Sequence, residues 1–397
     1  MRKVSKKDGK DKNNKTTEHD TSFTPGTLIL AQNKQGEWCD ARVVELRPNR
    51  AYKHKKVEEN LEFYVHYEGM NRRWDEWVNF QRIKVWEPGA RKQDYNHPVL
   101  EHDEHEGLDE RNLAKHEEST KFKTISFVEI GKFRCETWYF SPFPDYFQNI
   151  DTLYICEFCL SFFRSKDELI RHSDRCHLQH PMGNEIYREG NIAVFEIDGG
   201  RNVTYCENLC FISKLFLDHK NLGFDVEPFL FYVLTEVDEY GCHFAGYFSK
   251  EKDSQQGNNL SCILVMPFMQ RKGFGKFLIS LSYELSKKEQ KMGTPERPLS
   301  DLGYASYFSW WTAEIIDVLL ENQGQQLSIN DISQKTYIKP VDVLEVLEKL
   351  NILRYSQGSH VLYSNTEYLQ QLKKNTGKPG RPVYPDKLHW TPLKIIS

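Results

Sequence analysis

The 397-residue sequence lacks any run of about 18 apolar residues, the length that a membrane-spanning helix requires. Residues 1–20 also lack the apolar segment of a secretory signal peptide. No sign of charge dominates, because 53 basic residues stand against 57 acidic ones and give a net charge of −4. Nothing global therefore forces nucleic-acid binding, and electrostatic contacts must come from local patches. We expect a soluble, intracellular protein with no membrane partner.

The nine cysteines are scattered and odd in number, which does not suit a disulfide framework and indicates a reducing compartment. Four metal-binding residues stand out by their spacing: Cys156, Cys159, His172 and Cys176. Two thiolates on a tight turn and a His/Cys pair about one helical turn apart provide the four ligands of a tetrahedral zinc site. Because four protein ligands leave no position for water, we predict a structural zinc.

Composition divides the chain into five segments. The polar composition of residues 1–23 predicts a disordered tail, and the charged composition of residues 87–123 predicts a linker. Residues 24–86 contain short strand-like runs separated by polar turns, typical of a small β-barrel. Residues 124–370 mix strand and helix patterns, and residues 371–397 form a basic, proline-containing tail. The main domain is therefore expected to be α+β.

The stretch 258–288 has the pattern of a strand, a turn and a helix. The apolar strand has Cys262 at its centre and ends at Pro267, and a helical pattern follows the turn. The turn Gln270–Gly275 is rich in glycine and basic residues, so its free N–H groups and the helix dipole point at one position. This geometry suits the binding of a pyrophosphate.

Five motifs carry a family resemblance. They are Lys214–Lys220, Phe224–Phe229, Gly246–Lys252, the turn Gln270–Lys276 and Glu296–Gly303. Together they closely resemble the catalytic domain of the MYST histone acetyltransferases, over about residues 125–365. The resemblance implies the acetyl-CoA-dependent acetyltransferase fold, with a MYST-type zinc finger at residues 150–180 and a winged-helix-like C-terminal lobe.

The resemblance implies that Glu296 is the general base and that Cys262 lies in the active site. A free lysine has a pKa of about 10.4, so a carboxylate must remove its proton at neutral pH. Composition alone favours a surface role for Glu296 and a small core role for Cys262. Cys262 either carries the acetyl group transiently or only lines the site. We prefer direct attack by lysine, because apolar surroundings raise a thiol pKa and leave little thiolate.

The resemblance also implies contacts to acetyl-CoA. These residues are Ser261, Cys262, Ile263, Leu264, Val265, Gln270, Arg271, Lys272, Gly273, Phe274, Gly275, Lys276, Ser300 and Ser309. The family usually has threonine where this chain has Val265, so a side-chain bond is lost there. Lys220 matches the lysine that the enzyme acetylates on itself. Without the resemblance it would be a helix-end lysine that complements the helix dipole.

Two flanking segments indicate further modules. The run 64–78 resembles the chromo-barrel (tudor-knot) domain that some MYST enzymes carry. Its aromatic rings either wall a cage for methylated lysine or belong to the barrel core: Tyr64, Tyr67, Trp74 and Trp77. Some related barrels bind RNA instead, and Arg72 and Arg73 together with the basic loop Arg50–Lys56 suit that alternative. Near the C-terminus, a helix–turn–helix pattern carries Asp342, Glu345 and Glu348 on its second helix. DNA phosphates would repel these carboxylates, so the pattern does not indicate DNA binding. We expect a structural lobe there.

These expectations combine into a nuclear histone lysine acetyltransferase that acts on nucleosomal histone tails, most of all the histone-4 tail, within a chromatin-modifying complex. A non-catalytic chromatin adaptor is the main alternative, but it has no need of Cys262, Gln270–Gly275 or Glu296. A DNA-binding transcription factor is disfavoured by the acidic helix and by the single finger, which covers about three base pairs.

Overall fold

The computed structural model describes residues 23–48, 60–86, 122–218, 220, 225–325, 327–356, 359–362 and 365–393. The predicted disordered tail and linker lie outside these residues, apart from Phe23, Phe122 and Lys123. Among the described residues, no helix is both long and apolar enough to cross a membrane. The chain forms two compact units, Met1–Leu100 and Glu101–Ser397, which are described separately.

The first unit is a five-stranded antiparallel sheet in the order β4-β3-β2-β1-β5. Its strands are β1 (Leu28–Gln32), β2 (Trp38–Pro48), β3 (Leu61–Tyr67), β4 (Glu76–Asn79) and β5 (Ile83–Val85). Buried and accessible residues alternate along β1, so Ile29 and Ala31 enter one core together with Val43 and Phe63. The predicted small β domain is confirmed.

Two of the four aromatic residues proposed for a cage are buried in this unit, whereas Trp74 is 48% exposed. Tyr67 is buried, and its hydroxyl donates to Oε1 of Glu76 at 3.0 Å. Tyr64 is also buried and packs against Trp77 with ring centroids 5.2 Å apart. The guanidinium of Arg47 lies 4.1 Å from the Trp77 ring centroid. A cation of this chain therefore already contacts the ring face that a methylated lysine would need.

The second unit begins with a four-stranded sheet that supports the metal-binding segment. Its order is β7-β6-β8-β9, and β6 and β8 are parallel. The elements are β6 (Ile125–Ile130), β7 (Phe133–Glu136), β8 (Ile150–Ile155), β9 (Phe162–Phe163) and α2 (Lys166–Ser173). The buried residues Val128, Leu153 and Ile155 join the main core, so this sheet is part of the same unit.

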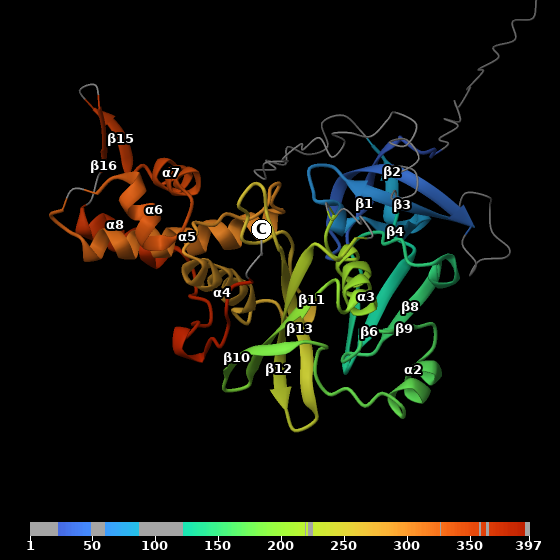
Figure 1. Cartoon of the computed structure of the whole chain (residues 1–397). Helices are drawn as coiled ribbons and strands as arrows, with labels where there is room; N and C mark the ends of the chain where they lie inside the picture. Colours follow the sequence, from blue (N-terminus) through green and yellow to red (C-terminus); the bar gives the residue numbers. More distant parts are fainter. Residues whose placement is uncertain are drawn as a thin grey trace, which may run out of the picture. The chain divides into compact units, whose positions relative to one another are not determined.

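A second sheet, antiparallel and five-stranded, forms the centre of this unit in the order β10-β11-β12-β13-β14. Its strands are β10 (Asn184–Glu189), β11 (Ile192–Asp198), β12 (Phe229–Asp238), β13 (Gly241–Glu251) and β14 (Ile263–Val265). The middle strands β12 and β13 are buried along most of their length, as expected where both faces are covered. In Figure 1 the sheet lies between α3 (Val203–Lys214) and α4 (Phe274–Glu289).

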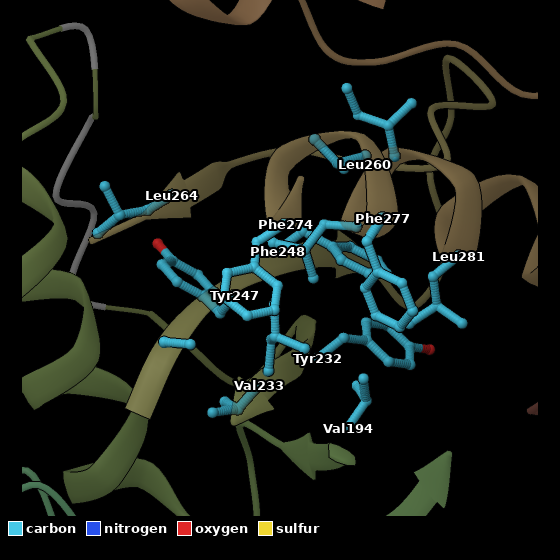
Figure 2. Close-up of a cluster of buried hydrophobic side chains, with 14 of the residues drawn as sticks. Val194, Tyr232, Val233, Tyr247, Phe248, Leu260, Leu264, Phe274, Phe277 and Leu281 are labelled. Atoms are coloured by element: carbon cyan, nitrogen blue, oxygen red, sulfur yellow. The ribbon is translucent and has the colours of Figure 1, made fainter. Parts of the chain in front are cut away.

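Helix α4 packs its apolar side on this sheet, as the sequence pattern predicts. The predicted residues Phe277, Leu278, Leu281 and Leu285 are all fully buried. Figure 2 shows Phe277 and Leu281 close to Tyr232 of β12, within a cluster that also holds Phe274 and Leu264. Burying each such side chain contributes about 1.5–3 kcal/mol. This packing fixes the first turn of α4 at the end of the edge strand β14.

The C-terminal part is mainly helical. Its elements are α5 (Asp301–Glu321), α6 (Ile329–Thr336), α7 (Pro340–Lys349), β15 (Leu353–Ser356), β16 (Ser359–Leu362) and α8 (Thr366–Asn375). Helices α6 and α7 followed by the β15–β16 pair confirm the winged-helix-like lobe. The boundary predicted at residue 370 falls inside α8, and the following residues still pack on the unit. Leu388 and Trp390 are buried, and the backbone N–H of His389 donates to Ile186 O at 2.7 Å.

Candidate functional site

The predicted zinc ligands converge in space. The ligand atoms of Cys156, Cys159, His172 and Cys176 all lie within 4.8 Å of one another. The Sγ atoms of Cys156 and Cys176 are 4.0 Å apart, and Sγ of Cys159 lies 3.2 Å from Nε2 of His172. Tetrahedral zinc bonds of about 2.0–2.3 Å place ligand atoms about 3.3–3.8 Å apart. The three thiols and one imidazole therefore fit a closed, structural zinc site.

Local structure positions these ligands. The turn that carries the first two cysteines is closed by the backbone N–H of Cys156, which donates to Ser161 O at 2.9 Å. Helix α2, which carries His172, begins with a capping box in which Ser165 and Glu168 satisfy each other's backbone N–H groups. The finger is therefore ordered by short-range contacts around its four ligands.

The loop 293–297 holds Glu296 between two neighbouring segments. On one side the backbone N–H of Glu296 donates to Leu260 O at 2.8 Å. On the other side the N–H of Gly293 donates to Tyr337 O at 2.9 Å. The loop therefore runs alongside the residues that lead into β14, which brings Glu296 to the start of that strand.

An ion-pair network fixes the next residue of this loop. The guanidinium of Arg297 lies 2.8 Å from Oδ1 of Asp342 and 2.9 Å from Oε2 of Glu345, both on α7. The hydroxyl of Tyr304 on α5 donates to Glu345 at 2.8 Å, and Lys349 lies 3.1 Å from the same carboxylate. Asp342 and Glu345 of the predicted second helix therefore bind Arg297, in the loop that carries Glu296, and Glu345 also binds Tyr304 and Lys349.

The Glu296 carboxyl has a raised pKa, although its side chain as a whole reaches solvent. Burial of the carboxyl is the largest cause of the shift. The hydroxyl of Ser261 lowers the pKa, the charge of Glu251 raises it, and the charge of Lys220 lowers it. The Ser261 Oγ is itself buried without a geometrically defined hydrogen bond. A carboxylate with a raised pKa suits a proton acceptor.

Cys262 lies one residue before β14 rather than at the centre of a strand. The sequence prediction was wrong here because β14 pairs with β13 only from Ile263 to Val265. The structure also places an ammonium group against this thiol, since Nζ of Lys220 is 3.4 Å from Sγ. The surroundings of Cys262 are therefore not simply apolar.

Lys220 is half-buried beside Cys262. Burial lowers the pKa of Lys220, but the Tyr247 phenol and the thiols of Cys262 and Cys210 raise it, and the net result lies well above the ordinary value. Helix α3 ends at Lys214, so Lys220 is not a helix-end lysine. Its Nζ instead contacts the sulfur of Cys262, and its positive charge lowers the pKa of Glu296.

The turn after β14 has the backbone expected of an anion site. A 3-10 helix, Pro267–Met269, precedes it, and α4 starts at Phe274. Arg271 (φ +65°) and Gly273 (φ +88°) adopt the left-handed conformation. A Cβ added at Gly275 would meet no atom within 4 Å, so space lies open there. With the buried Ser261 hydroxyl and the position of β14 at the end of the strand order, these features fit the pyrophosphate and the extended arm of acetyl-CoA.

Several residues expected at the cofactor have other partners. Nε2 of Gln270 donates to Val265 O at 3.1 Å, and Ser300 caps α5 by accepting from the N–H of Gly303. Lys276 and Ser309 both donate to Thr376 O, in the segment that follows α8. The same segment brings Arg381 to the turn, a residue that the sequence analysis did not single out. Its only sequence signal was the basic character of the tail.

Comparisons with known proteins cover both units. Residues 180–388 match the MOZ/SAS family, residues 122–176 match the MYST family zinc finger domain, and residues 23–85 match the tudor-knot domain, described as an RNA binding activity-knot of a chromodomain. The zinc-finger match contains all four ligands. The MOZ/SAS match contains Lys220, Cys262, the turn before α4 and Glu296.

Curated relatives align over most of the chain. "Histone acetyltransferase of the MYST family 1" of Arabidopsis thaliana is 45% identical over 388 residues, which cover 94% of this chain and 86% of the relative. "Putative MYST-like histone acetyltransferase 1" of Oryza sativa subsp. japonica is 44% identical, covering 93% and 85%. "Histone acetyltransferase ESA1" of Saccharomyces cerevisiae is 39% identical, covering 83% and 86%.

Proposed function

Because the chain belongs to the MYST family of histone acetyltransferases, we propose that it acetylates lysines of nucleosomal histone tails, in particular the histone-4 tail. It is an acetyltransferase that uses acetyl-CoA and carries a structural zinc. Its relatives imply a role on chromatin. The proposal adds that it works in the nucleus as the catalytic subunit of a chromatin-modifying complex.

One strand, β14, carries the proposal, because a proton acceptor lies at its start and the predicted cofactor turn follows its end. Glu296, Cys262 and Lys220 lie at the start of the strand. The glycine-containing turn and the first turn of α4 follow its end. An extended ligand that runs along this edge strand connects the two ends. Acetyl-CoA has that shape, with phosphates at one end and the thioester at the other.

Each residue of the site has a distinct proposed role. When bound, acetyl-CoA supplies the thioester carbonyl that the substrate amine attacks. The Glu296 carboxylate takes the proton from Nζ of the substrate lysine, and its raised pKa makes it a better acceptor than a fully solvated carboxylate. Cys262 lines the reaction centre. Lys220, with Nζ 3.4 Å from the Cys262 sulfur, is close enough to accept an acetyl group itself.

The barrel is proposed to bind RNA rather than methylated lysine. The burial of Tyr64 and Tyr67 and the contact of Arg47 with Trp77 leave no open four-ring cage among the described residues of this unit. The matched domain is described by an RNA-binding activity. Binding of RNA, but not of trimethyl-lysine peptides, by residues 1–100 supports this assignment, and the opposite result contradicts it.

Mass spectrometry of nucleosomes incubated with acetyl-CoA and the recombinant chain tests the main proposal. The wild-type chain should acetylate histone-tail lysines and itself at Lys220, and Glu296→Gln should do neither efficiently. A non-catalytic chromatin adaptor would leave all histones unmodified. Folded wild-type protein that binds acetyl-CoA yet transfers no acetyl group would contradict the proposal.

A further inference from the structure

Residues Thr376–Arg381, here called the C-terminal strap, lie against the first turn of α4. The Lys276 ammonium donates to Thr376 O at 3.2 Å and to Lys378 O at 2.9 Å. The Ser309 hydroxyl also donates to Thr376 O. A Cβ at Gly380 would lie 2.5 Å from the Cβ of Lys276, so only glycine permits this close approach. The strap is therefore fitted to α4.

These contacts change the role expected for Lys276. Two main-chain carbonyls already bind its ammonium group, and burial lowers its pKa. A lysine held in this way has little freedom to turn toward a phosphate. Lys276 and Ser309, both expected to contact acetyl-CoA, instead anchor the strap in this structure.

The strap delivers a different cation to the same turn. The guanidinium carbon of Arg381 lies 4.7 Å from the Phe274 ring centroid, Nε donates to Lys272 O at 3.2 Å, and the backbone N–H lies 3.5 Å from Gly273 O. Stacking on Phe274 and the Nε bond orient the planar group. Among the side-chain hydrogen bonds of the described residues, the Arg381 guanidinium donates only through Nε. Its two terminal nitrogens can therefore donate to a ligand.

We propose that Arg381 binds a phosphate group of acetyl-CoA, while Lys276 and Ser309 hold the strap that carries it. This inference rests on the proposed function, which places the cofactor at the turn before α4. A guanidinium fork matches the geometry of two phosphate oxygens better than an ammonium does. The strap is thereby one wall of the cofactor site, contributed by residues about 100 positions after the turn.

Calorimetry with acetyl-CoA tests the inference. Arg381→Gln keeps a planar side chain and removes the charge, so affinity should fall roughly 10- to 100-fold, the range of charge-assisted hydrogen bonds. The salt dependence of binding should weaken, because fewer ionic contacts form. Turnover at saturating acetyl-CoA should stay near the wild-type value while KM rises. The matched control Lys387→Gln removes one positive charge at an exposed position and should change affinity less than twofold.

Further variants separate the possible outcomes. Gly380→Ala should lower affinity with Arg381 intact, because the added Cβ displaces the strap. If Arg381→Gln loses affinity for acetyl-CoA but not for its analogue without the 3′-phosphate, Arg381 binds the 3′-phosphate. If the affinity for both compounds falls equally, Arg381 binds the pyrophosphate. Gly273→Asp puts a side chain and a negative charge into the turn, where Gly273 has φ +88°, and should abolish binding of acetyl-CoA. If Gly273→Asp does not bind but Arg381→Gln binds with wild-type affinity, the role of Arg381 is overturned and the proposed function stands. Failure of the wild-type chain to bind acetyl-CoA overturns both.

Discussion

The guanidinium of Arg297 lies 2.8 Å from Oδ1 of Asp342, a carboxylate whose side chain has 0% exposure, whereas the arginine is 47% exposed. Arg297 directly follows Glu296, and Asp342 lies in the first turn of α7. Burial raises the pKa of Asp342, and Thr294 and Arg297 lower it without cancelling the rise. The pair therefore ties the loop that carries Glu296 to the C-terminal lobe.

Removal of this arginine should destabilise the protein and loosen the loop. Arg297→Ala leaves Asp342 buried without its cation, which costs about 3–5 kcal/mol for a fully buried pair. Because Arg297 is partly solvated, we expect about 1–3 kcal/mol in urea unfolding at pH 7. Arg188→Ala, which breaks the exposed pair with Glu185, is the control and should cost less than about 1 kcal/mol.

The cost of Arg297→Ala should also depend on pH. The folded-state pKa of Asp342 is already raised, and loss of Arg297 raises it further. When the folded-state pKa of a carboxyl is raised, the protein becomes less stable as pH rises from the unfolded-state pKa of about 3.9 through the folded-state pKa. The difference between variant and wild type should therefore shrink as pH falls from 7 toward 4. A constant difference would argue against the ion pair as the cause.

Zinc should be required for the stability of the second unit. Cys159→Ser removes one of four ligands, so the protein should release zinc and unfold at a lower temperature, because metal binding and folding are coupled. Cys135→Ser, on β7 and outside the cluster, should keep its zinc. The measurements are metal content by mass spectrometry and thermal unfolding by circular dichroism. A zinc-free Cys159→Ser protein with wild-type stability would refute the structural role.

Cys262→Ala distinguishes two routes for the acetyl group. If the substrate lysine attacks the thioester directly, this variant should retain substantial turnover at saturating acetyl-CoA. If an acetyl-cysteine is obligatory, turnover should be lost at every pH. The ammonium of Lys220 at 3.4 Å from the sulfur does not itself decide between the routes. Acetyl-CoA affinity, measured by calorimetry, must be unchanged in the variant for the comparison to hold.

The features predictable from the sequence are those encoded by local spacing. The zinc ligands lie within 21 consecutive residues, and the apolar spacing of α4 follows its helical period. Arg297 and Asp342 are 45 positions apart, and Lys276 and Thr376 are 100 apart. No local pattern signals such contacts. The misplaced Cys262 has a similar cause, since only pairing with β13 decides where the short strand β14 begins.

The last prediction concerns Glu296 as the base. Glu296→Gln preserves the shape and removes the proton acceptor, so turnover at neutral pH should fall about 100- to 10,000-fold, the usual contribution of general-base catalysis.

The wild-type rate at low substrate concentration should rise with pH as the Glu296 carboxyl ionises. The midpoint of this rise should lie above the ordinary glutamate pKa of about 4.3, because burial raises the pKa of Glu296. In Glu296→Gln that rise should vanish, and the deficit should narrow at high pH, where more substrate lysine is already deprotonated. Glu251→Gln, which removes a nearby charge that raises the pKa of Glu296, should shift the midpoint downward and leave the plateau rate largely intact. Wild-type turnover by Glu296→Gln at neutral pH, under saturating acetyl-CoA, would show that another group accepts the proton.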